Sequence, residues 1–372
     1  MQRVVIIQGA LTHYRVKFFE CLRENLAQAG IELQLFHGKP PKNPDYVTGT
    51  LEWAHPVALF RLGPFCWHNN TWMQAQKADL VIAPQELRNG VPLMIQITRR
   101  LTRTRFAYWG HGKGFQSRNP NGFMETLKLF LRNHTDWWFA YNRISWNLVV
   151  EGGFPAGRTT AVMNSIDTAQ LRSFRDALSN TSLRDFRMMV NITSDNVAIF
   201  AGGMVPNKRI PFLLEALIEI RRQIPDFEMI FIGGGTERHF VSEAAAKHSW
   251  IHDCGPMNMA ETVPYWAISK LMLMPGLVGL VILDTFALGV PIVTSDFPYH
   301  SPEIDYLEDG INGLVIRCGE SSAAYAEGVT GLLKDPKRIE ELKNEALSSA
   351  GIYSVEKMAK NFTHGVIEAL QS

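Results

Sequence analysis

The chain of 372 residues is longer than one typical domain, and its 46% hydrophobic and 20% charged residues are typical of a globular protein with two cores. Lysine plus arginine (37) nearly equals aspartate plus glutamate (36), so the charge favours neither nucleic acid nor an acidic macromolecule as partner. The four cysteines show no paired spacing, which argues against a zinc site, a redox pair or a disulfide framework and favours a reducing, cytoplasmic compartment.

The first half alternates predicted strands with predicted helices, as expected for a doubly wound sheet. Residues 1–9 form a short apolar run without a cleavage site, so we predict a first strand rather than a leader. No later apolar run is long enough to span a bilayer. The predicted strands are 4–7, 31–36, 80–83, 105–109 and 137–140, and the predicted helices are 15–29, 87–102, 123–133 and 144–151.

A second alternating series follows a polar stretch, which predicts a second Rossmann-like domain in tandem with the first. The domain prediction is therefore 1–168, a linker over 169–195, and 196–353. Residues 354–372 have apolar positions at helical spacing and are predicted to pack back on the N-terminal domain. The predicted strands are 197–201, 229–232, 251–254, 271–274 and 291–294, with helices over 210–223, over 238–247 and after Val281.

Two loops after strands of the first half are candidate sites, because ligands gather beyond the carboxyl ends of parallel strands. Gly9 lets a backbone approach a ligand, and Arg15 near a helix start could hold phosphate or acceptor. The alternative is an ordinary turn with a solvated arginine. In the loop 109–114, alternating glycines surround His111 and Lys113, which favours a functional histidine over a structural one.

The second half contains two stronger candidates. Residues 201–209 carry Gly203, Lys208 and Arg209 ahead of a helix, an arrangement suited to phosphate. Residues 274–293 form a glycine loop and a buried helix with a single acid, Asp284, predicted to face a polar cavity. The alternative is an aspartate bonded to nearby backbone.

In this order, the segments resemble the family-4 retaining glycosyltransferases of the GT-B fold over nearly the whole chain. Residues 14–19, 163–167, 301–304 and 309–313 resemble further motifs of that family. The resemblance implies an α/β protein with two Rossmann-like domains facing each other across a cleft.

The resemblance also implies roles for individual residues. Lys208 would neutralise the donor diphosphate, together with Gly203, Arg209 and the backbone amides of Gly279 and Leu280, and Asp284 would bond the nucleotide ribose. Two departures accompany these matches: Gly276 stands where the family has its first acid, and Gly203 stands in place of an arginine.

On the acceptor side, the resemblance makes His111 the catalytic residue near the donor sugar. Gly9, Arg15, Lys113 and Gly276 would contact the sugar or the acceptor. Preorganised cations and amides suit the developing diphosphate charge, so we expect no metal and no cofactor beyond the donor.

The expected function is transfer of a sugar, with retention, from a nucleoside-diphosphate sugar to a glycan or lipid-linked acceptor, as in polysaccharide biosynthesis. A non-catalytic nucleotide-sugar-binding or regulatory subunit is the alternative, and a GT-B epimerase ranks last because no convincing set of acids and histidines is present. The arginines of 99–105, with Trp67 and Trp72, would fit an acceptor or peripheral contact with the cytosolic face of a membrane. A solvated helix end is the favoured explanation of those charges.

Overall fold

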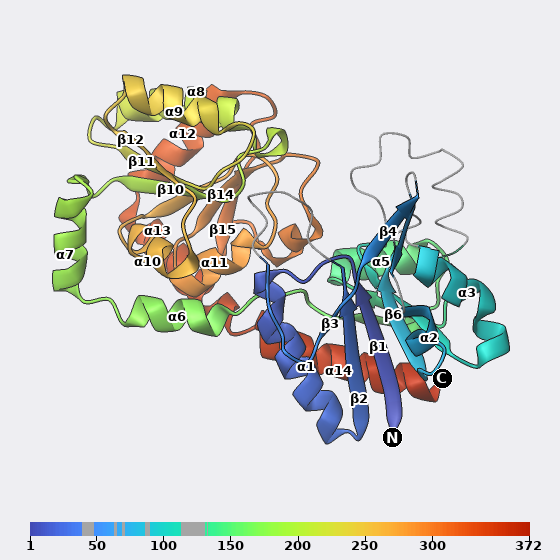
Figure 1. The fold of residues 1–372 in the computed structure, drawn as a ribbon. Helices are drawn as coiled ribbons and strands as arrows, with labels where there is room; N and C mark the ends of the chain where they lie inside the picture. Colours follow the sequence, from blue (N-terminus) through green and yellow to red (C-terminus); the bar gives the residue numbers. More distant parts are fainter. Residues whose placement is uncertain (39–47, 63–64, 69–70, 86–89, 113–130, 132) are drawn as a thin grey trace. The chain divides into compact units, whose positions relative to one another are not determined.

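The computed structural model describes the chain except residues 39–47, 63–64, 69–70, 86–89, 113–130 and 132 (Figure 1). The chain divides into two compact units, of which the first comprises 1–166 with 355–372 and the second comprises 167–354. Each unit is an α/β domain built on a parallel sheet.

The sheet of the first unit has seven strands in the order β3-β2-β1-β6-β7-β8-β9, and its neighbouring strands are parallel. Val4 to Ile7 in the central strand are 0% exposed, because helices cover both faces of a doubly wound sheet. The elements are β1 Gln2–Gln8, η1 His13–Arg15, α1 Val16–Gln28, β2 Ile31–His37, β3 His55–Pro56, β4 Leu59–Leu62, β5 Phe65–His68, α2 Thr71–Ala75, β6 Leu80–Pro84, α3 Gly90–Thr102, β7 Arg105–Gly110, β8 Trp137–Ala140, α5 Arg143–Glu151, η2 Ala156–Arg158, β9 Thr159–Ala161 and α14 Val355–Gln371.

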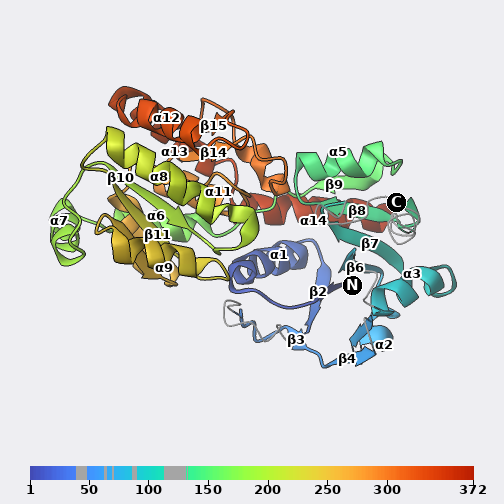
Figure 2. The ribbon, with the colours of Figure 1, turned by 90° about the horizontal axis from the view of Figure 1, so that it is seen from above.

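The helix α14 lies beside α1 in the first unit, although more than 300 residues separate them in the sequence (Figures 1 and 2). Met358, Phe362 and Val366 of α14 belong to the same apolar cluster as Phe18 and Leu22 of α1. This packing buries the apolar stripe that the sequence shows in the tail.

The sheet of the second unit has six parallel strands in the order β12-β11-β10-β13-β14-β15. The central strand β10 is buried at every position. The elements are α6 Thr168–Asp176, α7 Asn180–Met189, β10 Val197–Ala201, η3 Pro206–Lys208, α8 Ile210–Gln223, β11 Glu228–Ile232, α9 Arg238–Lys247, β12 Ile251–Gly255, α10 Met259–Ala267, β13 Leu271–Leu273, α11 Val281–Leu288, β14 Ile292–Ser295, η4 Pro302–Tyr306, β15 Gly313–Ile316, α12 Ser322–Leu333 and α13 Pro336–Ala350.

The segment 169–195, predicted as a linker, instead forms most of α6 and all of α7 and belongs to the second unit. Arg175 of α6 donates to the carbonyl of Ala287 in α11 at 2.8 Å. The polar stretch that suggested a linker is a helix start, since the Ser179 and Ser182 side chains form a capping box on α7.

None of the helices formed by the described residues combines the length and the hydropathy that a membrane-spanning segment requires.

Candidate functional site

A turn and a loop interlock at the carboxyl edge of the second unit's sheet. The turn is η3, which follows β10, and the loop is 275–280, which follows β13. Leu277 donates its backbone N–H to Asn207 at 2.8 Å, and the Lys208 ammonium donates to the Leu277 carbonyl. The structure therefore brings Lys208 against the glycine loop, as the phosphate-site hypothesis requires.

Gly276 is needed for this close approach. A Cβ atom at position 276 would lie 2.3 Å from the Asn207 oxygen and 2.5 Å from the Lys208 carbonyl carbon. Both are backbone atoms, so a larger residue would have to displace the turn. A glutamate at this position is incompatible with the observed arrangement, which gives the first departure from the family pattern a steric cause.

His300 holds the opposite side of the loop. Its Nδ1 accepts from the Val278 N–H at 3.0 Å, and its Nε2 lies 3.1 Å from the Ser295 carbonyl. These partners assign the proton to Nε2 and leave the ring neutral. Burial, with a smaller effect of the Lys208 charge, lowers the pKa of His300 in the same sense.

His300 is not among the residues predicted from the sequence. The only available signal was its position two residues before Pro302, between a buried strand and a short helical turn. That position gives no indication that the ring would face back toward the loop.

Lys208 is a cation without a carboxylate among the described residues. Its ammonium donates to the Leu277 carbonyl and lies 3.3 Å from the Met274 sulfur. Burial lowers the pKa of Lys208 from 10.5 to about 8. An anion bound beside it would favour the charged form and raise this pKa again.

The amides predicted to meet a diphosphate are available. Within the described part of the chain, the backbone N–H groups of Gly279 and Leu280 donate to no protein acceptor. They precede and cap α11, where the positive end of the helix dipole favours an anion.

Asp284 lies in the first turn of α11 and is half-buried. Burial raises the pKa of its carboxyl from 3.8 to about 7. Its carboxyl forms no hydrogen bond with any described residue, so the alternative of an aspartate held by nearby backbone finds no support. A carboxylate kept unpaired in this way is suited to accept hydrogen bonds from a ligand hydroxyl.

Arg209 makes its own set of contacts. Its backbone is left-handed at φ 58°, and its guanidinium pairs with Glu320 at 2.6 Å and lies 3.9 Å from the centre of the Phe212 ring. These contacts already neutralise the charge that was predicted to compensate for Gly203. Gly203 itself is exposed, and an added Cβ would meet nothing within 4 Å.

The predicted residues of the first unit lie at the carboxyl edge of its own sheet. Gly9 is open to a side chain, because an added Cβ would meet nothing within 4 Å. The His111 ring contacts the Tyr141 ring edge-on at 4.2 Å between centres. Arg15 is 8% exposed, which excludes the alternative of a solvated arginine. Lys113 lies outside the described residues.

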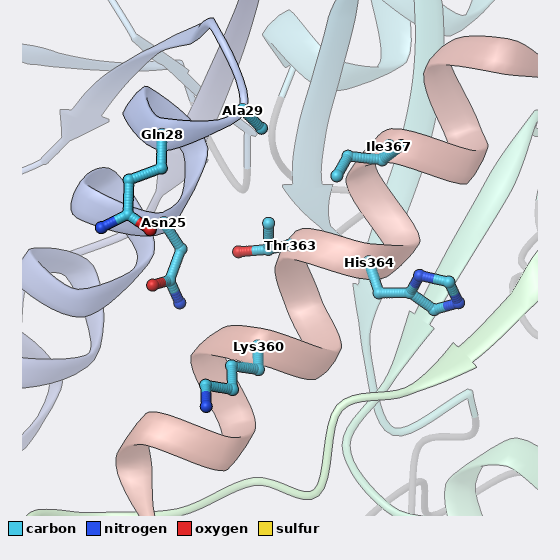
Figure 3. Close-up of a pocket in the computed structure, with 7 residues that line it drawn as sticks. All are labelled: Asn25, Gln28, Ala29, Lys360, Thr363, His364 and Ile367. Atoms are coloured by element: carbon cyan, nitrogen blue, oxygen red, sulfur yellow. The ribbon is translucent and has the colours of Figure 1, made fainter.

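A pocket of about 430 Å³ lies between α1 and α14 (Figure 3). Asn25, Lys360, Thr363 and His364 contribute to its lining, and His364 also pairs with Glu368 at 3.3 Å. The pocket contains none of the residues that the sequence analysis selected. Among the described residues, no group of three or more histidine, cysteine or acidic side chains could hold a metal ion.

Comparison with known proteins finds a family model that matches this part of the chain. Residues 195–335, which contain both the η3 turn and the 275–280 loop, match the family model described as Glycosyl transferases group 1. This segment is similar to the group 1 glycosyltransferases. The whole chain has the GT-B fold: it superposes on the Anabaena protein HepE in complex with UDP with a TM-score of 0.72, at 15% identity over 99% of this chain and 100% of that one.

Curated relatives of the group 1 domain match over shorter stretches. Spore coat protein SA of Bacillus subtilis is 26% identical over 229 residues, or 56% of each chain. A GDP-mannose-dependent phosphatidylinositol monomannoside mannosyltransferase of Mycolicibacterium smegmatis is 31% identical over 157 residues, 38% of this chain and 40% of the relative. The chain thus aligns with about half of the length of these relatives.

Proposed function

We propose that the protein is a glycosyltransferase that moves a sugar from a nucleoside-diphosphate sugar to a glycan or lipid-linked acceptor, with retention of anomeric configuration. The observation that carries the proposal is Lys208 held against the 275–280 loop, whose Gly279 and Leu280 amides have no acceptor among the described residues. The group 1 match over 195–335 supports it.

The chemical task is to stabilise the charge that grows on the diphosphate as the glycosidic bond breaks. Lys208 and the two amides would supply that stabilisation from fixed positions, without reorganising during the reaction. The unpaired Asp284 would accept hydrogen bonds from the ribose hydroxyls of the donor.

A panel of nucleotide sugars tests the identity of the donor base and sugar. HepE was solved with UDP-glucose and the mycobacterial relative is named as GDP-mannose-dependent, so UDP and GDP sugars are the first donors to test. A tightly bound donor raises the thermal stability of the protein by mass action, which makes a melting screen a direct readout.

Turnover separates the enzyme from the alternative of a non-catalytic nucleotide-sugar binder, which Gly203 and Gly276 motivate. Purified protein that binds a nucleoside diphosphate should also hydrolyse or transfer the matching sugar. We expect His111→Ala to slow turnover while leaving nucleotide affinity nearly unchanged, and Lys208→Met to weaken binding of the nucleotide itself. Tight nucleotide binding without turnover of any donor would reject the enzyme.

We also propose a cytoplasmic reaction, at the cytosolic face of a membrane where the acceptor is lipid-linked. Co-flotation of the protein with anionic lipid vesicles, compared with neutral vesicles, tests the membrane contact. Equal recovery with both would reject it.

A further inference from the structure

The first unit buries a cation that the proposed transfer chemistry does not use. Arg15 ends the η1 turn after β1 and is 8% exposed. Among the described residues it is the only buried lysine or arginine. Burying a guanidinium is unfavourable unless something compensates its charge and its N–H groups.

Aromatic rings supply part of the compensation. The guanidinium carbon lies 5.3 Å from the ring centres of both Tyr14 and Trp109, 5.8 Å from that of Tyr141 and 6.0 Å from that of Phe18. The rings come from η1, β7, the segment after β8 and α1. Ring faces attract a cation, but they do not act as strong acceptors for its N–H groups.

The hydrogen bonds of Arg15 are few and weak. Its Nη1 donates to the Met358 sulfur of α14 at 3.6 Å, a thioether that also receives the Ser165 N–H at 3.2 Å. A guanidinium carries five N–H donors, and a thioether is a poor acceptor. No described carboxylate pairs with Arg15, so most of its donors have no acceptor among the described residues and remain available to a ligand.

The rings of Tyr14, Phe18, Trp109 and Tyr141 form an aromatic cage around Arg15. This cage lies at the edge of the sheet where the first unit would bind a substrate. Gly9, Trp109 and Tyr141 lie at the carboxyl ends of the parallel strands β1, β7 and β8, where ligands of parallel sheets bind. Of these strands, β7 and β8 are neighbours, and β6 separates β1 from β7. Tyr141 contacts both Arg15 and His111 with its ring. Tyr14 and Tyr141 are half-buried, so the cage reaches the surface on this side.

We propose that Arg15 binds an oxyanion of the acceptor, a phosphate ester or a carboxylate, beside Tyr141 and His111. The proposal deepens the function proposed above and rests on it. A planar guanidinium grips two oxygens of such a group at once, and it cannot lose its proton to relieve burial. The acceptor class is therefore an anionic saccharide or a phosphate-linked one rather than a neutral glycan.

The test measures binding of two soluble probes, glycerol phosphate and glucuronate, by titration calorimetry with saturating UDP or GDP in the donor site. We expect Arg15→Met, which keeps an apolar stem among the rings, to weaken the preferred probe by at least about tenfold. Arg23→Met is the matched control, because Arg23 also lies over a ring, that of Trp53 at 4.7 Å, but is exposed. This control should bind within about twofold of the wild type.

The probe that binds identifies the source of the oxyanion. Glycerol phosphate points to a phosphate-linked acceptor, and glucuronate points to an acidic sugar. Failure of the wild type to bind either probe, or a folded Arg15→Met that binds as the wild type does, would overturn the proposal. Lys208→Met should lose nucleotide binding and keep probe binding. The donor site and the acceptor site are then tested independently of each other.

A second measurement serves if Arg15→Met does not fold. In protein labelled at arginine with ¹⁵N, the Arg15 side-chain N–H resonance is assigned by its absence in Arg15→Lys. Titration of the wild type with the bound probe should shift this resonance and leave that of Arg23 in place. An unmoved Arg15 resonance at saturating probe would reject the proposal.

Discussion

Within the residues that the structure describes, each unit keeps a cation without a carboxylate partner at the carboxyl edge of a parallel sheet. Lys208 in the second unit lies 3.3 Å from the Met274 sulfur, and Arg15 in the first lies 3.6 Å from the Met358 sulfur. Lys208 also has a carbonyl acceptor, and its pKa is lowered to about 8. Loss of its proton would therefore remove the unfavourable unpaired charge. Arg15 has no such route. A buried lysine can therefore become neutral when no anion is bound. A buried arginine keeps its charge and needs aromatic rings or a ligand to compensate it.

We expect the largest effect from Lys208→Met, which removes the unpaired cation of the second unit. Removing a charge-assisted contact to diphosphate should weaken nucleoside-diphosphate binding by about 1.5–3 kcal/mol, or roughly 10- to 100-fold, in calorimetric titrations. Lys270→Met is the control, since Lys270 lies in the same unit but donates to Asn196 at 3.0 Å at the amino end of β13. Equal weakening by both changes would show that general charge, not this site, binds the nucleotide.

The lowered pKa of Lys208 gives the same site a pH signature. Diphosphate binding requires the protonated form, so wild-type affinity should fall as pH rises from about 7 to about 9.5 through the pKa near 8. The affinity of Lys208→Met should be nearly flat over that range. A wild-type profile as flat as that of the variant would contradict a titrating Lys208.

The next effect concerns the packing that positions Lys208. Gly276→Ala should lower the free energy of unfolding by about 1–3 kcal/mol, because its Cβ would overlap the η3 backbone. Gly203→Ala adds the same atom into open space and should change stability by less than about 0.5 kcal/mol. Similar urea midpoints for the two variants would mean that the turn and the loop do not pack as described.

Asp284 provides a smaller effect with a definite sign. Its pKa is raised from 3.8 to about 7 in the folded protein. Between these two pH values the folded protein keeps a proton that the unfolded chain has released. The free energy of unfolding therefore falls as the pH rises through this range. Asp284→Asn should therefore become more stable than the wild type by about 1–2 kcal/mol at pH 7 and above, since solvent screens the half-buried group. Exposed Asp185→Asn should show no such trend in melting temperature.

The smallest expected effect is a gain in nucleoside-diphosphate affinity. Gly203→Arg restores the cation of the family pattern at an exposed, open position and should tighten nucleoside-diphosphate binding by about three- to tenfold, or ~1 kcal/mol. Gly203→Ala controls for the loss of glycine flexibility. Unchanged affinity in the arginine variant would mean that position 203 does not face the diphosphate.

Most of the sheet architecture could be predicted from the sequence, because buried parallel strands are continuous apolar runs. Val4 to Ile7 and the β10 strand fit that pattern and form the centres of the two sheets. The edge strands β9 and β15 were missed, since strands of three and four residues carry too little periodic signal. The predicted helix over 123–133 lies mostly outside the described residues.

Residue types predicted the site better than orientations did. Lys208 and the 275–280 loop meet as expected because adjacent parallel strands end at one edge. Two features of the site depend on tertiary contacts that no local sequence pattern encodes. One is the left-handed backbone of Arg209, whose side chain pairs with Glu320, and the other is the hydrogen bond from Val278 to His300. The roles predicted for Gly9, His111 and Asp284 stay predictions until ligands are bound.

The position of α14 has a consequence for how the protein is made. The first unit needs residues 355–372 to complete its core, and these are synthesised only after the whole of the second unit, 167–354. During translation the second unit can close as one continuous segment, while α1 exposes the apolar face that α14 later covers. The first unit can therefore complete its core only after the second unit has been synthesised, and the contact between Arg15 and the Met358 sulfur forms no earlier.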